Sequence, residues 1–159
     1  MKKIFIFITL ISIFILTGCN NENAKDKEYH SYVNILKEST EFESELPFDI
    51  SIYLKKLNDD EVTYKVIIDN PKKELKNIES IIIHDNKTND IYPSIGIYDD
   101  KVSLIPNKVD KDNNIVKGII LTGYIPYSGE INNLKVSFKL LFKYTDSEGE
   151  HTIIYSTKK

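Results

Sequence analysis

The sequence contains no arginine and no tryptophan, and it has a single cysteine. All 21 basic residues are therefore lysines, so the guanidinium groups that bind phosphate or guanine in a bidentate manner are missing. With 24 acidic residues the formal net charge is −3. This balance argues against nucleic acid as a partner. The single cysteine, Cys19, also excludes an internal disulfide bond.

Common catalytic and metal-binding motifs are also missing. None of the three histidines, His30, His84 and His151, lies in His-Glu-x-x-His spacing, in a Gly-x-Ser-x-Gly elbow or in a Ser-x-x-Lys motif. We therefore expect neither an enzyme nor a cofactor. The alternative is an envelope enzyme with a site built from loops, which requires His84 or His151 to lie within ~3 Å of an acid or a nucleophile.

One long hydrophobic run is present, and it lies at the amino end of the chain. Lys2 and Lys3 precede an almost entirely apolar stretch at residues 4–16. The small residues Thr17 and Gly18 follow it. This order of segments is typical of an export signal. A helix of this length would span about 20 Å, whereas the hydrocarbon core of a bilayer is about 30 Å thick, so a permanent membrane span is disfavoured.

The residues Leu16, Thr17, Gly18 and Cys19 resemble the lipobox of bacterial lipoproteins. The resemblance implies that diacylglycerol is attached to the Cys19 thiol and that residues 1–18 are removed as a signal peptide. Each buried methylene contributes about 0.8 kcal/mol, so two or three acyl chains would hold the protein on the outer face of the cell membrane. Lipidation would also block a thiol that has no partner in an oxidising compartment. A soluble secreted protein is the alternative.

Removal of residues 1–18 leaves 19 lysines and 24 acidic residues, a formal charge of −5. Residues 19–28, which begin with the lipidated cysteine, are mostly polar, and we interpret them as a flexible tether. The remaining residues 29–159 suit one domain with its own hydrophobic core. The start of this domain has room for one short helix, because four apolar residues follow helical spacing. They are Tyr29, Tyr32, Val33 and Leu36.

From Phe48 onward, apolar and polar residues alternate with a period of two, which is typical of half-buried strands. Residues 48–68 predict one hairpin, and residues 134–156 predict another. Shorter strands are expected between them, at residues 78–84, 91–98, 102–105 and 116–125. Together these segments predict an all-β domain, a single antiparallel β-sandwich of the immunoglobulin or fibronectin type.

Acidic and amide side chains alternate at Asp110, Asp112 and Asn114, as they do at the start of a calcium-binding loop. The pattern then departs from an EF-hand, because Ile115 replaces the turn glycine and Leu121 replaces the bidentate glutamate. We interpret the segment as a solvated turn that uses local hydrogen bonds. A calcium site is the weaker alternative.

Four tyrosines lie beside turn residues, and we interpret them as a binding patch. They are Tyr92, Tyr98, Tyr124 and Tyr127. Tyrosine offers a broad apolar face and a polar tip, which suits recognition of protein or sugar. The alternative is structural, since tyrosine favours strands and often fixes a loop at the corner of a sandwich.

These observations favour a membrane-anchored extracytoplasmic lipoprotein that acts as a binding or adaptor module. Its expected partners are the membrane, through lipid on Cys19, and a protein or an envelope polymer. The alternatives are an envelope enzyme and a lipoprotein that binds calcium or another small ligand.

Overall fold

The computed structural model describes residues 21–86 and 94–159. Cys19, the predicted signal peptide and Tyr92 lie outside these ranges, so the predictions for them stay predictions. The chain divides into two compact units, residues 1–32 and residues 33–159. The second unit contains all of the strands described below.

The expected short helix is present as α2, which covers Asn21–Glu38. It begins well before residue 29, within the segment that we interpreted as a flexible tether. Alanine, glutamate and lysine are frequent there and favour helix, and Asp26 lies 3.4 Å from His30 one turn later. The end of the helix belongs to the second unit, where Val33 and Leu36 are buried. Within the described ranges, no helix is both long and apolar enough to cross a membrane.

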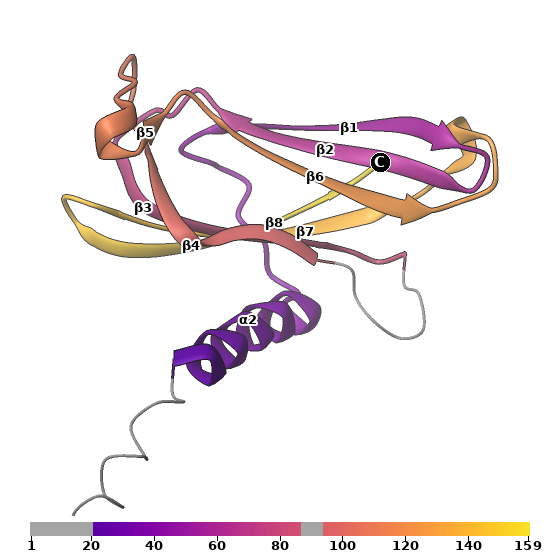
Figure 1. Cartoon of the computed structure of the whole chain (residues 1–159), viewed down its shortest axis with the longest axis horizontal. Coiled ribbons are helices and arrows are strands. Elements are labelled where there is room, and N and C mark those ends of the chain that lie inside the picture. The colour runs from indigo at the N-terminus through magenta and orange to yellow at the C-terminus, as the bar shows by residue number, and fades with distance from the viewer. Residues whose placement is uncertain (1–20, 87–93) are drawn as a thin grey trace, which may run out of the picture. The chain divides into compact units, whose positions relative to one another are not determined.

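Two sheets lie one above the other in the second unit (Figure 1). The first has the order β1-β2-β6, with β1 at Asp49–Asn58, β2 at Glu61–Asp69 and β6 at Ile119–Pro126. The second has the order β5-β4-β3-β7-β8. Its strands are β3 at Leu75–His84, β4 at Ser94–Leu104, β5 at Ile115–Val116, β7 at Ser137–Asp146 and β8 at Gly149–Lys158.

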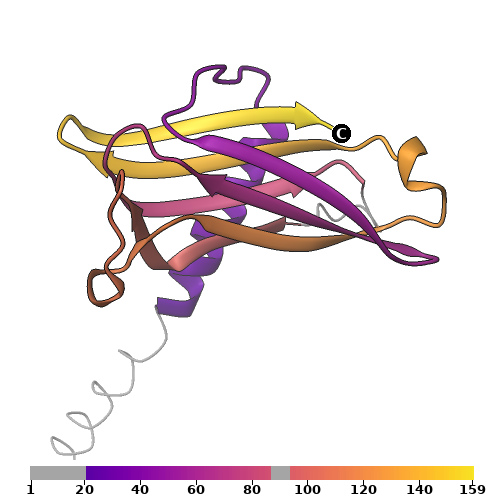
Figure 2. The ribbon, with the colours of Figure 1, turned by 90° about the horizontal axis from the view of Figure 1, so that it is seen from above.

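The predicted all-β sandwich is confirmed. Every strand pairing is antiparallel except that of β4 with β5, which is parallel. In Figure 2, β1 and β2 run obliquely over the strands of the five-stranded sheet. Two short 3-10 helices complete the described fold, at Lys111–Asn113 and Ile131–Asn133. The immunoglobulin or fibronectin type stays a prediction.

Both predicted hairpins are confirmed. β1 pairs with β2, and β7 pairs with β8. Along β2 the apolar parity is fully buried, as the alternation predicts. The buried residues of this strand are Val62, Tyr64, Val66 and Ile68.

The middle of the chain differs from the prediction in two ways. The strands expected at residues 91–98 and 102–105 form one strand, β4, in the described part that begins at Ser94. The strand expected at residues 116–125 is split, because β5 belongs to the five-stranded sheet and β6 to the other. Lys117 and Gly118 separate the two pieces. The alternation of apolar and polar residues shows which face of a strand is buried, but it does not show which sheet the strand joins.

The interior of the sandwich is filled from both sheets by aromatic and aliphatic side chains. Tyr64 of β2 lies directly opposite Gly123 of β6. Its ring covers the glycine so closely that a Cβ atom at residue 123 would overlap the ring and its hydroxyl group. Burial raises the pKa of the Tyr64 phenol to about 12. Residue 123 must therefore be glycine for the tyrosine to keep this place.

Candidate functional site

Large apolar side chains are exposed on the outer side of the three-stranded sheet. Among the described residues, seven large hydrophobic side chains are exposed, and four of them belong to β1 and β6. Tyr53 is 59% exposed, Ile120 is 60% exposed and Tyr124 is 52% exposed. Each alternates with buried neighbours along its strand, so these three side chains point away from the core.

The strand register arranges this surface in rows. Lys65 lies between Tyr53 and Thr122, and Thr63 lies between Lys55 and Tyr124. A third row places Ile67 between Ser51 and Ile120. We call these nine residues the outer face. They are Ser51, Tyr53, Lys55, Thr63, Lys65, Ile67, Ile120, Thr122 and Tyr124.

Two tyrosines lie at opposite sides of the outer face. Tyr53 and Tyr124 are two strands and one row apart, which corresponds to a Cα separation of about 12 Å for strands 4.8 Å apart with a rise of 3.4 Å per residue. Threonine and lysine side chains occupy the positions between them. The outer face therefore offers two separated aromatic rings with hydrogen-bonding and cationic groups in between.

The four predicted tyrosines have different surroundings. Tyr124 is on the outer face, whereas Tyr98 is half-buried on β4 of the other sheet. The Tyr127 hydroxyl donates to the carbonyl oxygen of Glu130 at 3.3 Å, and its ring packs on Gly129. These contacts favour the structural interpretation of Tyr127.

The binding patch predicted from the sequence did not include Tyr53 or Ile120. The signal was present, because Tyr53 has the same parity as Asp49, Ser51 and Lys55 in an alternating strand. An aromatic residue at a polar parity is therefore worth examining as a surface contact.

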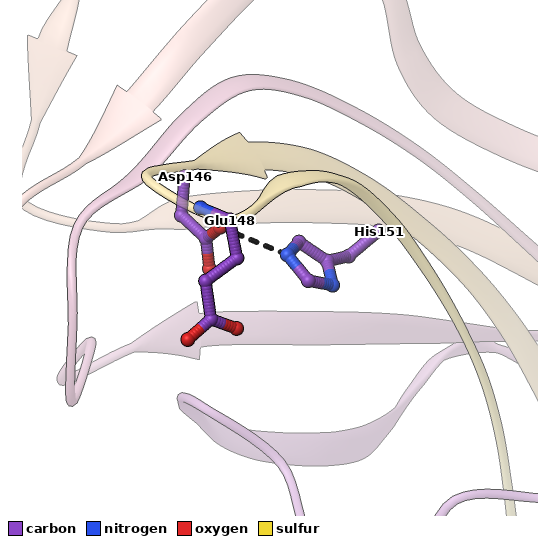
Figure 3. Close-up of side chains that lie close together, drawn as sticks. All are labelled: Asp146, Glu148 and His151. Atoms are coloured by element: carbon purple, nitrogen blue, oxygen red, sulfur yellow. Dashed lines mark hydrogen bonds and ion pairs between the residues drawn. The ribbon is translucent and has the colours of Figure 1, made fainter.

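A second candidate site lies at the turn between β7 and β8 (Figure 3). Asp146, Glu148 and His151 are close enough that their ligating atoms all lie within 4.8 Å of one another. His151 Nε2 is 2.8 Å from Asp146 Oδ1. The Asp146 side chain is only 6% exposed, whereas Glu148 is exposed to solvent.

The Asp146 carboxylate is held from several directions. Lys73 Nζ donates to Oδ2 at 2.7 Å, and the Glu148 amide donates to Oδ1 at 2.8 Å. Lys73 first, and then the Glu148 amide and His151, hold the pKa of Asp146 well below its usual range. The same ion pair, together with Tyr144, raises the pKa of Lys73. The Asp146 carboxylate is consequently ionised at neutral pH.

His151 meets the distance condition set for an envelope enzyme, because an acid lies within hydrogen-bonding reach. His84 does not meet it: the side chain is 1% exposed, and neither ring nitrogen has a hydrogen-bond partner in the described chain. Burial lowers the pKa of His84. The main chain of Tyr124 and the carboxylate of Asp85 offset this lowering only in part, because neither forms a well-aligned hydrogen bond with the ring. The chemistry of His84 is thus that of a neutral core residue.

The predicted calcium candidates form a capped turn. Asp110 Oδ1 accepts hydrogen bonds from the amides of Asp112 and Asn113, and Oδ2 accepts one from the Asn113 side chain. These bonds, the Asn113 side chain first, lower the pKa of Asp110. Asn114 ends the turn in the left-handed region with φ of 52°. The geometry favours the interpretation as a solvated turn.

Neither a protein family model nor a curated protein sequence matches the chain. The function is therefore argued from the chemistry of the chain itself.

Proposed function

We propose that this chain is a lipid-anchored binding module that holds an envelope polymer on the outer face of the cell membrane. The lipobox resemblance at residues 16–19 supports the location. The binding role rests on one observation, the exposure of Tyr53, Ile120 and Tyr124 on a single sheet face. Exposed aromatic groups that share one face are typical of binding surfaces.

The arrangement of the outer face supports an extended ligand rather than a small one. Tyr53 and Tyr124 are about 12 Å apart, so a single small ring does not reach both. An extended chain of sugar units would contact both rings and the hydroxyl groups of Thr63 and Thr122 between them. Lys55 and Lys65 add positive charge, which suits a polymer with anionic groups.

The polymer assignment is tested with the processed lipoprotein in detergent and with isolated cell-wall polysaccharide. Replacing both tyrosines by alanine (Y53A/Y124A) should weaken binding about 30-fold, if each aromatic contact contributes about 1 kcal/mol. The stability of this variant should change by less than about 0.5 kcal/mol per site, since both side chains are exposed. Binding is measured by co-sedimentation, and stability by urea denaturation.

Val109→Ala is the matched control, because Val109 is equally exposed but lies off the outer face. Wild-type-like binding by Y53A/Y124A would contradict the proposal. Loss of a specific protein partner in that variant, with no polysaccharide binding by the wild type, would replace the polymer with a protein.

The location is tested separately by Cys19→Ser. We expect the variant to accumulate uncut or to appear in the medium, because it cannot carry the acyl chains. Cell fractionation and the mobility of the protein on a gel provide the measurement. Correct processing and retention on the envelope would refute lipid anchoring without affecting the argument for the outer face.

A further inference from the structure

The β7–β8 turn gathers nitrogen and oxygen ligands that serve neither the outer face nor the proposed polymer. We infer that it is a binding site for a divalent transition-metal ion, with His151 Nε2, Asp146 Oδ1 and the Glu148 carboxylate as ligands. This inference is independent of the proposed function, because the residues lie on the five-stranded sheet.

The hairpin register brings the two central ligands together. Asp146 lies opposite Gly149, and Tyr144 lies opposite His151, so Asp146 and His151 are diagonal neighbours on one face of the ladder. Gly149 has no side chain, and its φ of 126° favours glycine. In this diagonal arrangement the carboxylate and the imidazole lie 2.8 Å apart, and Gly149 allows the backbone conformation that the turn requires.

The histidine ring is held in place by its neighbours. Tyr144 stacks on His151 with a centroid distance of 4.9 Å and an interplanar angle of 18°. Asp146 is fixed by the Glu148 amide and by Lys73. Two ligands are thus positioned before a metal arrives, whereas the exposed Glu148 side chain can turn toward it. Positioned ligands reduce the cost of binding.

The distance between the two fixed ligand atoms selects among metals. An ion about 2.1 Å from each atom would make an N–metal–O angle of about 84°, close to the 90° between neighbouring ligands in octahedral or tetragonal sites. Cu²⁺ and Ni²⁺ favour such sites with nitrogen and oxygen ligands. A tetrahedral zinc site would require these two atoms to separate, and Ca²⁺ prefers more oxygen ligands than the turn provides.

Lys73 does not occupy the proposed metal position. Its ammonium group binds Oδ2, and the metal would replace the proton shared by His151 Nε2 and Oδ1. Metal-ligating carboxylates are often hydrogen-bonded through their other oxygen, as this one is to Lys73. The lysine charge opposes a cation, so the affinity should be moderate. It should also fall at low pH, because the metal competes with a proton for the imidazole.

The inference is tested by titrating the processed lipoprotein with Cu²⁺, Ni²⁺, Zn²⁺ and Ca²⁺ in a calorimeter. We expect one Cu²⁺ ion per chain, weaker binding of Ni²⁺ and Zn²⁺, and no binding of Ca²⁺. His151→Gln should lower the Cu²⁺ affinity at least 10-fold. Electron paramagnetic resonance should show coupling to one imidazole nitrogen in the wild type and none in this variant.

His30→Gln is the matched control, since His30 and Asp26 form the other described histidine–aspartate pair but have no third ligand within the described residues. This variant should bind Cu²⁺ as the wild type does. Asp146→Asn provides a second test, with circular dichroism to verify folding. Absence of Cu²⁺ binding, unchanged affinity in folded His151→Gln, or loss of binding in His30→Gln would each overturn the site.

Discussion

Histidine side chains lie at both ends of the five-stranded sheet, and their surroundings are opposite. His84 ends β3 inside the core, where it packs edge-on against Tyr64 with ring centroids 5.3 Å apart. His151 lies near the start of β8, beside an ionised carboxylate and within reach of solvent. The core accepts only the neutral imidazole, whereas the turn tolerates a cation. A positive charge should therefore destabilise the fold much more at position 84 than at position 151.

The sharpest test of this contrast places a permanent charge at each position. His84→Lys should lower the free energy of unfolding by at least about 3 kcal/mol, because an unpaired ammonium group would be buried. His151→Lys should change it by less than about 1 kcal/mol, since the lysine is partly exposed and can approach Asp146. Urea denaturation at pH 7 measures both. Equal losses at the two positions would contradict this difference between the core and the turn.

Acidification should destabilise the wild type through the buried His84. The pKa of His84 is lowered in the folded state from the ordinary value of 6.5, so the unfolded state binds this proton first. The stability that the neutral His84 contributes is complete above pH 6.5, and it falls as the pH decreases toward the lowered folded pKa. The slope from this group is at most about 1.4 kcal/mol per pH unit.

His84→Phe keeps an aromatic ring in the core and removes the titrating group. We expect this variant to lose less stability than the wild type between pH 6.5 and pH 5. Parallel stability curves for wild type and His84→Phe would contradict the assignment of the slope to His84.

The smallest expected change in stability comes from a substitution in the β7–β8 turn. Asp146→Asn removes the charge that Lys73 and His151 contact, so the urea midpoint at pH 7 should fall. The folded pKa of Asp146 is lowered, so the stability from its charge is present above the ordinary value of 3.8 and is lost as the pH falls below it. The difference between variant and wild type should therefore shrink below pH 3.8. Asp100→Asn, at an exposed acid, should leave the midpoint unchanged at pH 7.

Alternation in the sequence was sufficient to predict the hairpins, because a residue's parity decides whether it is buried. It could not predict the crossing at Lys117 and Gly118, where the apolar pattern continues while the chain changes sheets. The exchange of partners depends on pairings between residues far apart in sequence. One of these is the parallel pairing of Ser103 with Ile115.

The candidate sites were predictable only in part. Tyr124 was identified from its local sequence, but its neighbours on the outer face depend on the register of three strands. Asp146, Glu148 and His151 all lie within the hairpin predicted at residues 134–156, but the alternation does not show that their side chains meet. The contribution of Lys73 could not be expected, since it is 73 residues away from Asp146 along the chain.

Gly123, which is covered by the Tyr64 ring, also affects the outer face of the three-stranded sheet. If β6 slipped by two residues along β2, Leu121 or Ile125 would face the tyrosine ring, and neither leaves room for it. The glycine at residue 123 therefore fixes the register of β2 and β6, because only this residue leaves room for the Tyr64 ring. The same alignment determines which side chains are neighbours on the outer face, so the absence of a Cβ atom at residue 123 affects the solvent-exposed side of the sheet.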